Sequence, residues 1–454
     1  MSAAARSSTD PARRAAADVV LAVDRDQAFA NLLLPRILRE RSISGTEAAF
    51  ATELAYGTLR RQGSLDAVLA VAARRPPADL DPPVRAVVRL GAYQLLHTRV
   101  PPHAAVSTTV ELGRELAGPR TSGLVNAVLR RVAERDWAGW VERLAPADPV
   151  GRLGFERGYP EWIATALLDA LDGDLGELDR ALTDERPVTH LVARPGRIER
   201  AELLGLAGPA ASAGPWSPYA VRLAGGDPAG IAAVRDGRAA VQDEGSQLAA
   251  LALARAPLEG GDERWLDACA GPGGKASLLA GLLPADGRLL AVDRSAHRAR
   301  LTAQALGPGR GRVVVADATR PGWPEGGFDR VLVDAPCTGL GALRRRPEVR
   351  WRRQPADVER LHPLQRALLE RAIDAVRPGG LVGYVTCSPH RRETTDVVAA
   401  VTAGRGDVEA VDVPPLFPEL PAGGVGRTLQ LWPHRHGTDA MFVALLRRKL
   451  DELP

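Results

Sequence analysis

Apolar residues recur at helical spacing along the first third of the chain. Asp10 followed by Pro11 predicts the start of the first helix, because aspartate caps free amide groups and proline suits the first helical position. Amphipathic helices are predicted over residues 11–23, 28–38, 47–59, 65–73, 83–96, 106–116 and 121–135, separated by glycine, proline or serine. The pattern therefore predicts an all-α domain over residues 10–140.

The next hundred residues have a weaker pattern. Residues 194–227 are rich in glycine, alanine and proline and show little periodicity. The charge balance also changes here, from an excess of arginine in the helical region to an excess of acidic residues. We interpret residues 141–240 as a helical connector followed by a small α+β segment.

From about Val241 short apolar segments alternate with helical ones. Helices are predicted after each of the first three strands and at Asp357–Val376, and residues 407–413 and 441–446 are candidates for edge strands. This alternation is typical of a doubly wound parallel sheet, so residues 241–450 are predicted to form an α/β Rossmann-like domain. The predicted strands are Trp265–Ala268, Arg288–Val292, Arg312–Ala316, Arg330–Val333 and Leu381–Val385.

The composition is that of a folded, water-soluble protein. The 454 residues are 45% apolar and 25% charged, and 59 basic against 55 acidic side chains give a net charge of +4. Disordered, collagen-like and coiled-coil chains are excluded as the main architecture. Lys275 and Lys449 are the only lysines, so the abundance of arginine reflects a general bias and argues only weakly for nucleic-acid binding.

Compartment is indicated by the apolar runs and the cysteines. No stretch of 18 consecutive apolar residues is present, and the first residues lack the apolar core of a signal peptide. Three cysteines, Cys269, Cys337 and Cys387, are a poor basis for a disulfide framework and fit a reducing environment. We therefore expect a cytoplasmic protein without membrane contact.

A glycine-rich segment, the cofactor loop, lies between the first predicted strand and the following helix. Glycine at a strand-to-helix turn permits positive φ and close approach of a ligand, and the helix start exposes free amide groups. The spacing differs from the dinucleotide and phosphate-binding glycine motifs, which disfavours both ligands. The loop runs Cys269-Ala270-Gly271-Pro272-Gly273-Gly274-Lys275.

Aspartates end the next three predicted strands, at Asp293, Asp317 and Asp334. Open α/β sheets bind ligands at the carboxyl edge, where a carboxylate in the position of Asp293 can accept hydrogen bonds from both hydroxyls of a ribose. A single aspartate at a strand end can equally cap a helix or a turn. Three in succession favour a ligand site.

Two cysteines follow predicted strands at the same edge. Cys337 closes Asp334-Ala335-Pro336-Cys337, and Cys387 lies in Thr386-Cys387-Ser388. Either thiol alone is more simply a small core residue. Their joint position beside the cofactor loop favours chemistry, and the residues alone leave the two thiols exchangeable as nucleophile.

These segments, in this order, resemble the motifs of the Sun (Fmu) family of RNA cytosine-5 methyltransferases. The matching segments are Asp267–Lys275, Asp334–Cys337 and Thr386–Ser388. The predicted helical domain, with Gly91–Leu96 and Val125–Arg130, resembles the NusB-like RNA-binding domain of bacterial members that act on small-subunit rRNA. The resemblance covers nearly the whole chain.

Two further segments resemble the ends of the family's catalytic domain. Val241–Gln247 is similar to its opening segment, which implies packing near the cofactor pocket. His436–Phe442 is similar to its closing segment, which implies that Asp439 lies near the active site. The family more often has Gly-Phe-Phe after this aspartate, where the present chain has Ala-Met-Phe.

The resemblance implies S-adenosylmethionine as the methyl donor. It implies that the cofactor loop holds the donor, with Asp293 at the ribose, Asp317 near the adenine and Asp334 near the methionine and the target base. Cys269 lies inside the loop, and we expect it to have a packing or backbone role.

The resemblance also implies roles for the two thiols. Cys387 is the implied nucleophile, and Cys337 is implied to assist product release. A thiol is needed because C5 of cytosine is a poor nucleophile until a thiolate adds to C6. Asp334 is expected to hydrogen-bond or protonate N3 of the base as charge develops in the ring.

The densest basic run, the arginine run, follows Cys337 over residues 343–353. Guanidinium groups pair with phosphates and stack on bases, and an aromatic neighbour suits unpaired RNA. We predict that this run binds RNA beside the thiols, and a solvated arginine-rich loop is the alternative. Its predicted RNA contacts are Arg344, Arg345, Arg346, Arg350, Trp351, Arg352 and Arg353.

The leading hypothesis is a monomeric enzyme that forms 5-methylcytosine in 16S rRNA. A methyltransferase acting on tRNA or another RNA is one alternative, and a non-catalytic RNA-binding or antitermination-like factor is another. The two thiols and the complete cofactor loop argue against the non-catalytic alternative, and the NusB-like region favours rRNA. No His/Cys spacing suggests a zinc site, so no metal is expected.

Overall fold

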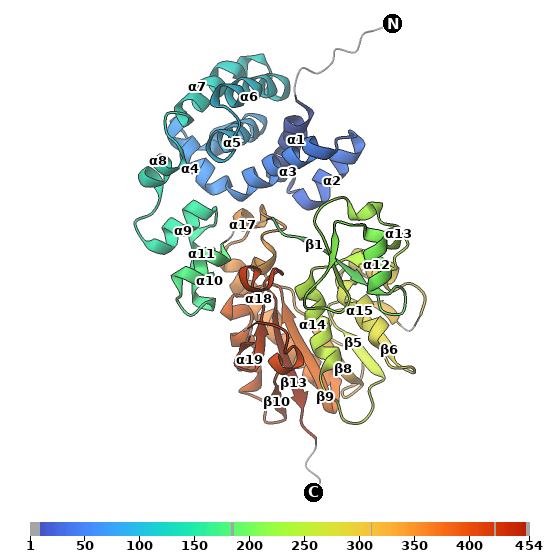
Figure 1. The fold of residues 1–454 in the computed structure, drawn as a ribbon. Helices are drawn as coiled ribbons and strands as arrows, with labels where there is room; N and C mark the ends of the chain where they lie inside the picture. The colour runs from blue at the N-terminus through green and yellow to red at the C-terminus, as the bar shows by residue number, and fades with distance from the viewer. Residues whose placement is uncertain (1–9, 183–185, 310, 422–423, 451–454) are drawn as a thin grey trace. The chain divides into compact units, whose positions relative to one another are not determined.

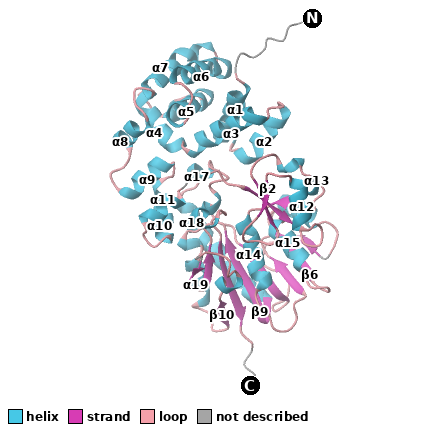
Figure 2. Ribbon diagram, in the orientation of Figure 1, coloured by secondary structure: helices cyan, strands magenta, loops and turns pink. Residues whose placement is uncertain are grey.

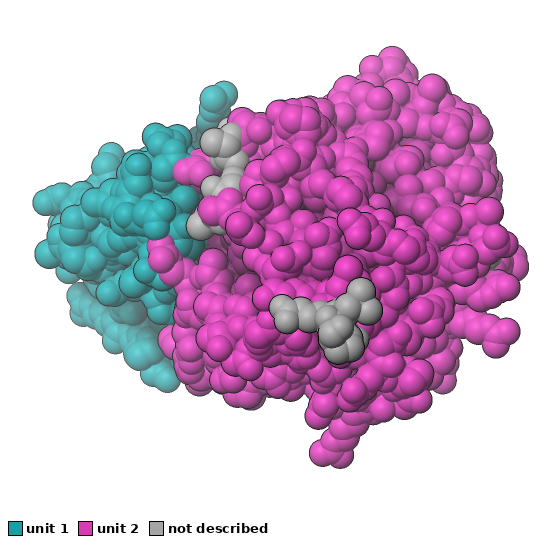
Figure 3. All heavy atoms as spheres, turned by 90° about the horizontal axis from the view of Figure 1, so that it is seen from below, with its two compact units in different colours: residues 1–184, 345–353 teal, residues 185–344, 354–454 magenta. Residues whose placement is uncertain are grey.

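The structure, a computed structural model, describes residues 10–182, 186–309, 311–421 and 424–450. Contacts divide the chain into two compact units (Figure 3). The first comprises residues 1–184 and 345–353, and the second comprises residues 185–344 and 354–454. Most of the arginine run therefore packs with the first unit, although it lies within the second in sequence.

The first unit is helical (Figure 1). Asp10 caps α1, because its Oδ1 accepts the Arg13 amide at 2.9 Å, and small residues such as the fully buried Ala15 and Ala16 let the helices pack closely. The predicted helical domain is confirmed, and its helices continue past residue 140, where the sequence suggests a connector. The helices are α1 Pro11–Asp26, α2 Ala30–Glu40, α3 Gly45–Arg60, α4 Gln62–Ala73, α5 Pro82–His97, α6 Pro102–Ala117, α7 Ser122–Val132, α8 Trp137–Leu144, α9 Pro149–Arg157, α10 Glu161–Ala170, α11 Leu175–Ala181 and α17 Val349–Arg352.

The second unit begins with a small antiparallel sheet in the order β2-β3-β1-β4. Leu191, Val221 and Leu203 form its core with their neighbours, so α12 packs on this sheet. The sheet and its helices have the bounds β1 Thr189–Ala193, α12 Arg200–Ala207, β2 Ala211–Ala213, β3 Ala220–Leu223, α13 Ala232–Arg235 and β4 Ala239–Val241.

The larger sheet has the order β11-β12-β13-β9-β8-β5-β6-β7, with β10 paired to β13. The strands from β9 to β7 are parallel, as predicted, and β13 is antiparallel to β9. The sheet is therefore mixed, and residues 441–446, expected at an edge, contribute to the internal strand β13. The bounds are β5 Arg264–Asp267, β6 Arg288–Asp293, β7 Gly311–Val315, β8 Phe328–Asp334, β9 Val376–Thr386, β10 Val408–Val411, β11 Gly424–Val425, β12 Thr428–Gln430 and β13 Phe442–Arg448.

Helices cover both faces of this sheet (Figure 2). Alternate strand residues point to opposite faces, so Leu332 joins the core under α14 and α15 while Val331 and Val333 join the core under α18 and α19. The helices are α14 Glu244–Arg255, α15 Gly274–Leu282, α16 Ala296–Leu306, α18 Pro355–Ala375, α19 Thr395–Thr402 and α20 Pro433–His436.

The helix predicted after the third strand is absent from residues 316–327, which the structure describes throughout. The prediction was wrong because this connection contains Pro321, Pro324 and three glycines, which disfavour a helix. The chain instead runs through turns from β7 to β8.

Candidate active site

The cofactor loop lies at the carboxyl ends of the parallel strands, between β5 and α15. Gly271 and Gly273 have φ of 55° and 92°, a left-handed conformation that side chains disfavour. A Cβ on Gly273 would also lie 2.8 Å from Thr302 Cα, so the loop packs directly on α16. The glycines therefore permit both the turn and the close helix packing.

Asp293 fastens this loop to the end of β6. One carboxylate oxygen accepts the Gly271 amide at 3.0 Å, and the other accepts the Ser295 amide at 2.7 Å. Arg298 forms an ion pair with the same carboxylate at 3.1 Å. Asp293 is buried beside the loop. Its hydrogen bonds hold the loop against the end of β6, which is a structural role.

Asp317 lies two residues beyond β7 at the same edge and is exposed. Its Oδ1 accepts the Thr319 hydroxyl at 2.7 Å and the Thr319 amide at 2.9 Å. These two hydrogen bonds, the hydroxyl first, lower the pKa of Asp317. The carboxylate is thus ionised and closes a local turn.

Asp267, at the end of β5, is a fully buried carboxyl group beneath the loop. Its Oδ1 accepts the Cys269 amide at 3.3 Å, while Oδ2 has no partner in the described structure. Burial, followed by the nearby Asp334 charge, raises the pKa of Asp267 to about 7. Burial likewise raises the pKa of Cys269, which agrees with a packing role for that thiol.

Substituting Asp267→Asn is expected to make the protein's stability less dependent on pH. In the unfolded chain an aspartate loses its proton near pH 4, whereas the folded Asp267 holds it to about pH 7. The wild-type fold therefore loses roughly 3 to 4 kcal/mol as pH rises through this window, and asparagine removes that loss. The free energy of unfolding, measured for both proteins on either side of the window, checks this. A difference between them that does not change with pH would contradict it.

Lys275 and Asp334 form a partly buried ion pair beside the loop. Lys275 Nζ donates to Asp334 Oδ2 at 2.8 Å, and the side chains of Lys275 and Asp334 are 9% and 30% exposed. Burial lowers the pKa of Lys275, but the Asp334 carboxylate outweighs burial and the net shift is upward. The lysine therefore stays charged, and it places a fixed positive charge at this edge of the sheet.

The two strand-end thiols lie together. β8 and β9 are parallel neighbours, so the turns after them meet, and the Cys337 and Cys387 sulfur atoms are 3.4 Å apart without a disulfide. The hydrogen bond between the two thiols, helped by Lys275, lowers the pKa of Cys387, and the same bond raises the pKa of Cys337. Cys387 is therefore the more acidic of the two thiols.

Gly341 locks the backbone of Cys387. Its amide donates to the Cys387 carbonyl at 2.9 Å, and its carbonyl accepts the Ala440 amide at 3.0 Å. A Cβ on Gly341 would lie 2.0 Å from the Ala440 carbonyl oxygen, so only glycine fits. The turn after Cys337 and the segment before β13 thus hold the turn that carries Cys387 between them.

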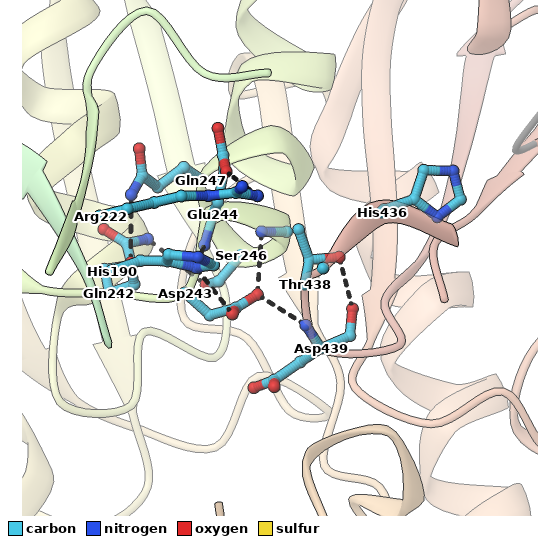
Figure 4. A network of polar contacts seen from close by, with 12 residues as sticks. His190, Arg222, Gln242, Asp243, Glu244, Ser246, Gln247, His436, Thr438 and Asp439 are labelled. Atoms are coloured by element: carbon cyan, nitrogen blue, oxygen red, sulfur yellow. Dashed lines mark hydrogen bonds and ion pairs between the residues drawn. The ribbon is translucent and has the colours of Figure 1, made fainter. Parts of the chain in front are cut away.

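A polar network joins the small sheet to this region (Figure 4). Asp243 caps α14, accepting the Gly245 amide at 2.9 Å, and its same oxygen accepts the Asp439 amide at 3.0 Å. His190 Nδ1 of β1 accepts the Glu244 amide at 3.0 Å. Asp439, which the family resemblance implies lies near the site, is therefore tied to the start of α14, and Arg344 lies 3.7 Å from its carboxylate.

The arginine run is not an exposed surface. Among its six arginines and Trp351, only Arg346 is exposed. Arg352 donates to the Val23 and Ala28 carbonyls at 3.1 and 2.6 Å, and Trp351 Nε1 donates to the Leu59 carbonyl at 2.7 Å.

The ends of α1 and α3 explain this docking. Helix C-termini present unpaired carbonyls and partial negative charge, which guanidinium and indole N–H groups satisfy. RNA contact by the run stays a prediction, and Arg346 is the arginine whose exposure suits it best.

Replacing Arg350 by alanine is expected to destabilise the first unit by about 3 kcal/mol. Its side chain is 0% exposed, donates to the Gly158 carbonyl at 2.9 Å and the Tyr159 hydroxyl at 3.0 Å, and covers the Tyr159 ring at 3.7 Å. Chemical unfolding of the variant measures the loss. The exposed Arg346→Ala is the matched control, and an equal small effect of both substitutions would contradict the structural role.

Several residues of the site do not belong to any of the sequence motifs described above. Gly341, Gln365 and Glu393 hold the thiol-bearing turns. Glu393 is the only acidic residue among the eight that follow Cys387, and Gly341 is the second of two closely spaced glycines after Cys337. Both features were visible in the sequence, but only the fold gives them a partner.

Neither a metal centre nor a membrane segment emerges from the described residues. No group of three or more His, Cys, Asp or Glu side chains among them is arranged to hold a metal ion. None of the described helices is long and apolar enough to cross a membrane.

Two known protein families match this chain, one in its C-terminal half and one near its N-terminus. The family described as 16S rRNA methyltransferase RsmB/F matches residues 253–447, and the NusB family matches residues 10–134. The chain is 55% identical to Rv1407 of Mycobacterium tuberculosis, named as a methyltransferase, over 97% of each chain. It is 34% identical to ribosomal RNA small subunit methyltransferase B of Pseudomonas syringae over 96% of each chain.

Solved structures show the same fold. PH0851 has a TM-score of 0.81 at 22% identity, covering 97% of this chain and 99% of its own. NSun6 from Pyrococcus horikoshii with SFG has a TM-score of 0.54 at 20% identity, covering 64% of this chain and 99% of its own. At these identities the likeness extends to the fold alone.

Proposed function

The chain belongs to the RsmB/F family of 16S rRNA methyltransferases and carries an N-terminal NusB domain, and from this premise we propose that it methylates C5 of a cytosine in 16S rRNA. The observation that carries the proposal is the thiol pair, with sulfur atoms 3.4 Å apart beside the Lys275–Asp334 ion pair. We propose S-adenosylmethionine as the methyl donor and a monomer acting in the cytoplasm.

The residues around the cofactor loop fit this donor. Two buried acceptor oxygens without a described partner border the loop, Gln242 Oε1 and Asp267 Oδ2. The ammonium and hydroxyl groups of S-adenosylmethionine are donors of the kind that such oxygens lack. NSun6 from Pyrococcus horikoshii, which shares the fold, was solved with SFG, an analogue of this donor. When bound, the donor supplies an electrophilic methyl group, which C5 accepts.

We propose that the cofactor loop, Cys269–Lys275, holds the donor. Asp293 lies at the ribose, where a hydroxyl would replace Arg298, the 47% exposed partner of its carboxylate. Asp317 lies near the adenine, and Asp334 lies near the methionine and the target base. Each carboxylate stands at the carboxyl edge, where this class of sheet binds ligands.

The thiols and Asp334 perform the steps on the cytosine. The Cys387 thiolate adds to C6, forming an S–C6 bond, and the electrons of the C5=C6 bond move into the ring toward N3. The acid form of Asp334 donates a hydrogen bond or its proton to N3 as this negative charge develops. After methylation, the C5 proton passes to water, its C–H electrons restore the C5=C6 double bond, and the C6–S bond breaks with its electrons returning to sulfur. Cys337, which holds its proton more tightly, assists this release by hydrogen-bonding to the departing Cys387 sulfur 3.4 Å away.

Detection of 5-methylcytosine tests the proposal. The protein is incubated with donor labelled in the methyl group and with naked 16S rRNA, assembled small subunits, or tRNA, and the nucleosides are analysed by mass spectrometry. Labelled 5-methylcytosine in 16S rRNA or in the subunits is the expected result. Label confined to tRNA would reassign the substrate, and no 5-methylcytosine in any RNA would exclude the enzyme and favour an RNA-binding factor.

A further inference from the structure

A buried carboxylate supports the turn that carries Cys337. Glu393 lies in the short 3-10 helix η5, Arg391–Glu393, and is 0% exposed. Its Oε1 accepts the Thr338 backbone amide at 2.8 Å, and its Oε2 accepts the Thr338 hydroxyl. Thr338 follows Cys337 directly, so Glu393 fixes the backbone on one side of this thiol.

Gln365 of α18 fixes the backbone on the other side. Its Nε2 donates to the Pro336 carbonyl at 2.9 Å and to Glu393 Oε1 at 3.1 Å. Pro336 directly precedes Cys337. The thiol-bearing residue is therefore held between two anchored neighbours, and Glu393 Oε1 accepts hydrogen bonds both from the Thr338 amide and from the glutamine that anchors Pro336.

The same carboxylate is connected to the turn that carries Cys387. The Thr338 hydroxyl lies 3.3 Å from the hydroxyl of Ser388, the residue after Cys387. The Tyr384 hydroxyl donates to the Glu393 backbone carbonyl at 2.8 Å, which ties η5 to β9, the strand that ends directly before Cys387. A buried carboxylate is costly unless it is fully hydrogen-bonded, so this network favours a single arrangement of both turns.

We propose that Glu393 is a positioning residue that sets the separation of the Cys337 and Cys387 sulfur atoms. It acts through the backbone beside Cys337. Its effect on catalysis rests on the proposed function, whereas its effect on the distance between the thiols does not. The alternative is that Glu393 only stabilises the fold, and the experiment separates the two.

The first readout is turnover by variants at Glu393. Glu393→Ala removes both links to Thr338, and a misplacement of reacting groups by about 1 Å is expected to lower kcat roughly 100-fold with an unchanged KM for the donor. Glu393→Gln keeps an oxygen for the Thr338 amide and donates to its hydroxyl, so it is expected to retain most of the activity. The matched control is Glu359→Ala, which removes an exposed partner of the neighbouring Arg392.

The second readout measures the thiol pair directly and needs no RNA. Phenylarsine oxide binds tightly only when two thiols bond the same arsenic atom: two As–S bonds form, and the two thiol protons leave with the arsenic-bound oxygen as water. Wild type, Glu393→Gln and Glu359→Ala are expected to bind it equally. Glu393→Ala is expected to bind it at least about tenfold more weakly, because the two sulfur atoms no longer act as one site.

Thermal unfolding and donor binding establish that the variants are folded. If Glu393→Ala does not fold, Thr338→Val removes the hydroxyl link alone and is expected to weaken arsenical binding in the same direction. Wild-type arsenical affinity in a folded Glu393→Ala or Thr338→Val protein would overturn the proposal. Normal arsenical binding by wild type without any methylation would count against the proposed function and leave the positioning role standing.

Discussion

Replacing Cys337 by alanine is expected to leave the protein covalently attached to its RNA, whereas Cys387→Ala is expected to lower methyl transfer about 10⁴-fold or more. The hydrogen bond between the thiols lowers the pKa of Cys387 and raises that of Cys337. We therefore expect Cys387, the more acidic of the two thiols, to be the one that adds to C6. Without Cys337 the proposed reaction passes methyl transfer and stops before the C6–S bond breaks.

A denaturing gel with labelled 16S rRNA and donor measures the attachment, and released 5-methylcytosine measures turnover. The Cys337→Ala protein should give a slowly migrating adduct that contains the protein, the RNA and the transferred methyl group. The double variant Cys337→Ala/Cys387→Ala is the control and should give none. An adduct formed by Cys387→Ala alone would reverse the two roles.

The carboxyl edge of the sheet could be predicted from the sequence because its signals are local. A glycine turn after one apolar strand and polar residues after the next identify strand ends, and parallel strands bring those ends to one edge. The cofactor loop, Asp293 and Cys387 all follow from this rule. The separation of the thiols does not, because it depends on β8 and β9 being neighbours in a sheet whose order is set by long-range packing.

The arginine run shows the opposite case. Its charge is evident in the sequence, and charge without tertiary structure suggests a surface for phosphates. Arg352 and Trp351 instead satisfy carbonyl groups near the ends of helices about 300 residues earlier in the chain. A sequence pattern identifies donors but not the acceptors that the fold brings to them. For the same reason the sequence does not reveal that Glu393 accepts hydrogen bonds from Thr338.

Lys275→Met is the second substitution with a large expected effect, roughly a 100-fold fall in the rate of methyl transfer at neutral pH. The ammonium group neutralises Asp334 at 2.8 Å and lowers the pKa of Cys387, whereas the Asp334 and Asp439 carboxylates raise it. Methionine fills a similar volume without the charge. The variant should therefore hold less Cys387 thiolate at neutral pH, and its Asp334 carboxylate should lie unpaired beside the base.

The dependence of the rate on pH separates this effect from simple damage to the loop. The pKa of Cys387 rises in the variant, so the thiolate fraction and the single-turnover rate should recover part of the loss as pH rises from about 7 to about 9. Lys449→Met is the matched control, because Lys449 is the only other lysine and its exposed Nζ donates to the Gly406 carbonyl. A loss of rate that is equally large at every pH would mean that Lys275 stabilises the cofactor loop and does not affect the ionisation of Cys387. A normal rate in Lys275→Met would mean that the ion pair has no role in methyl transfer.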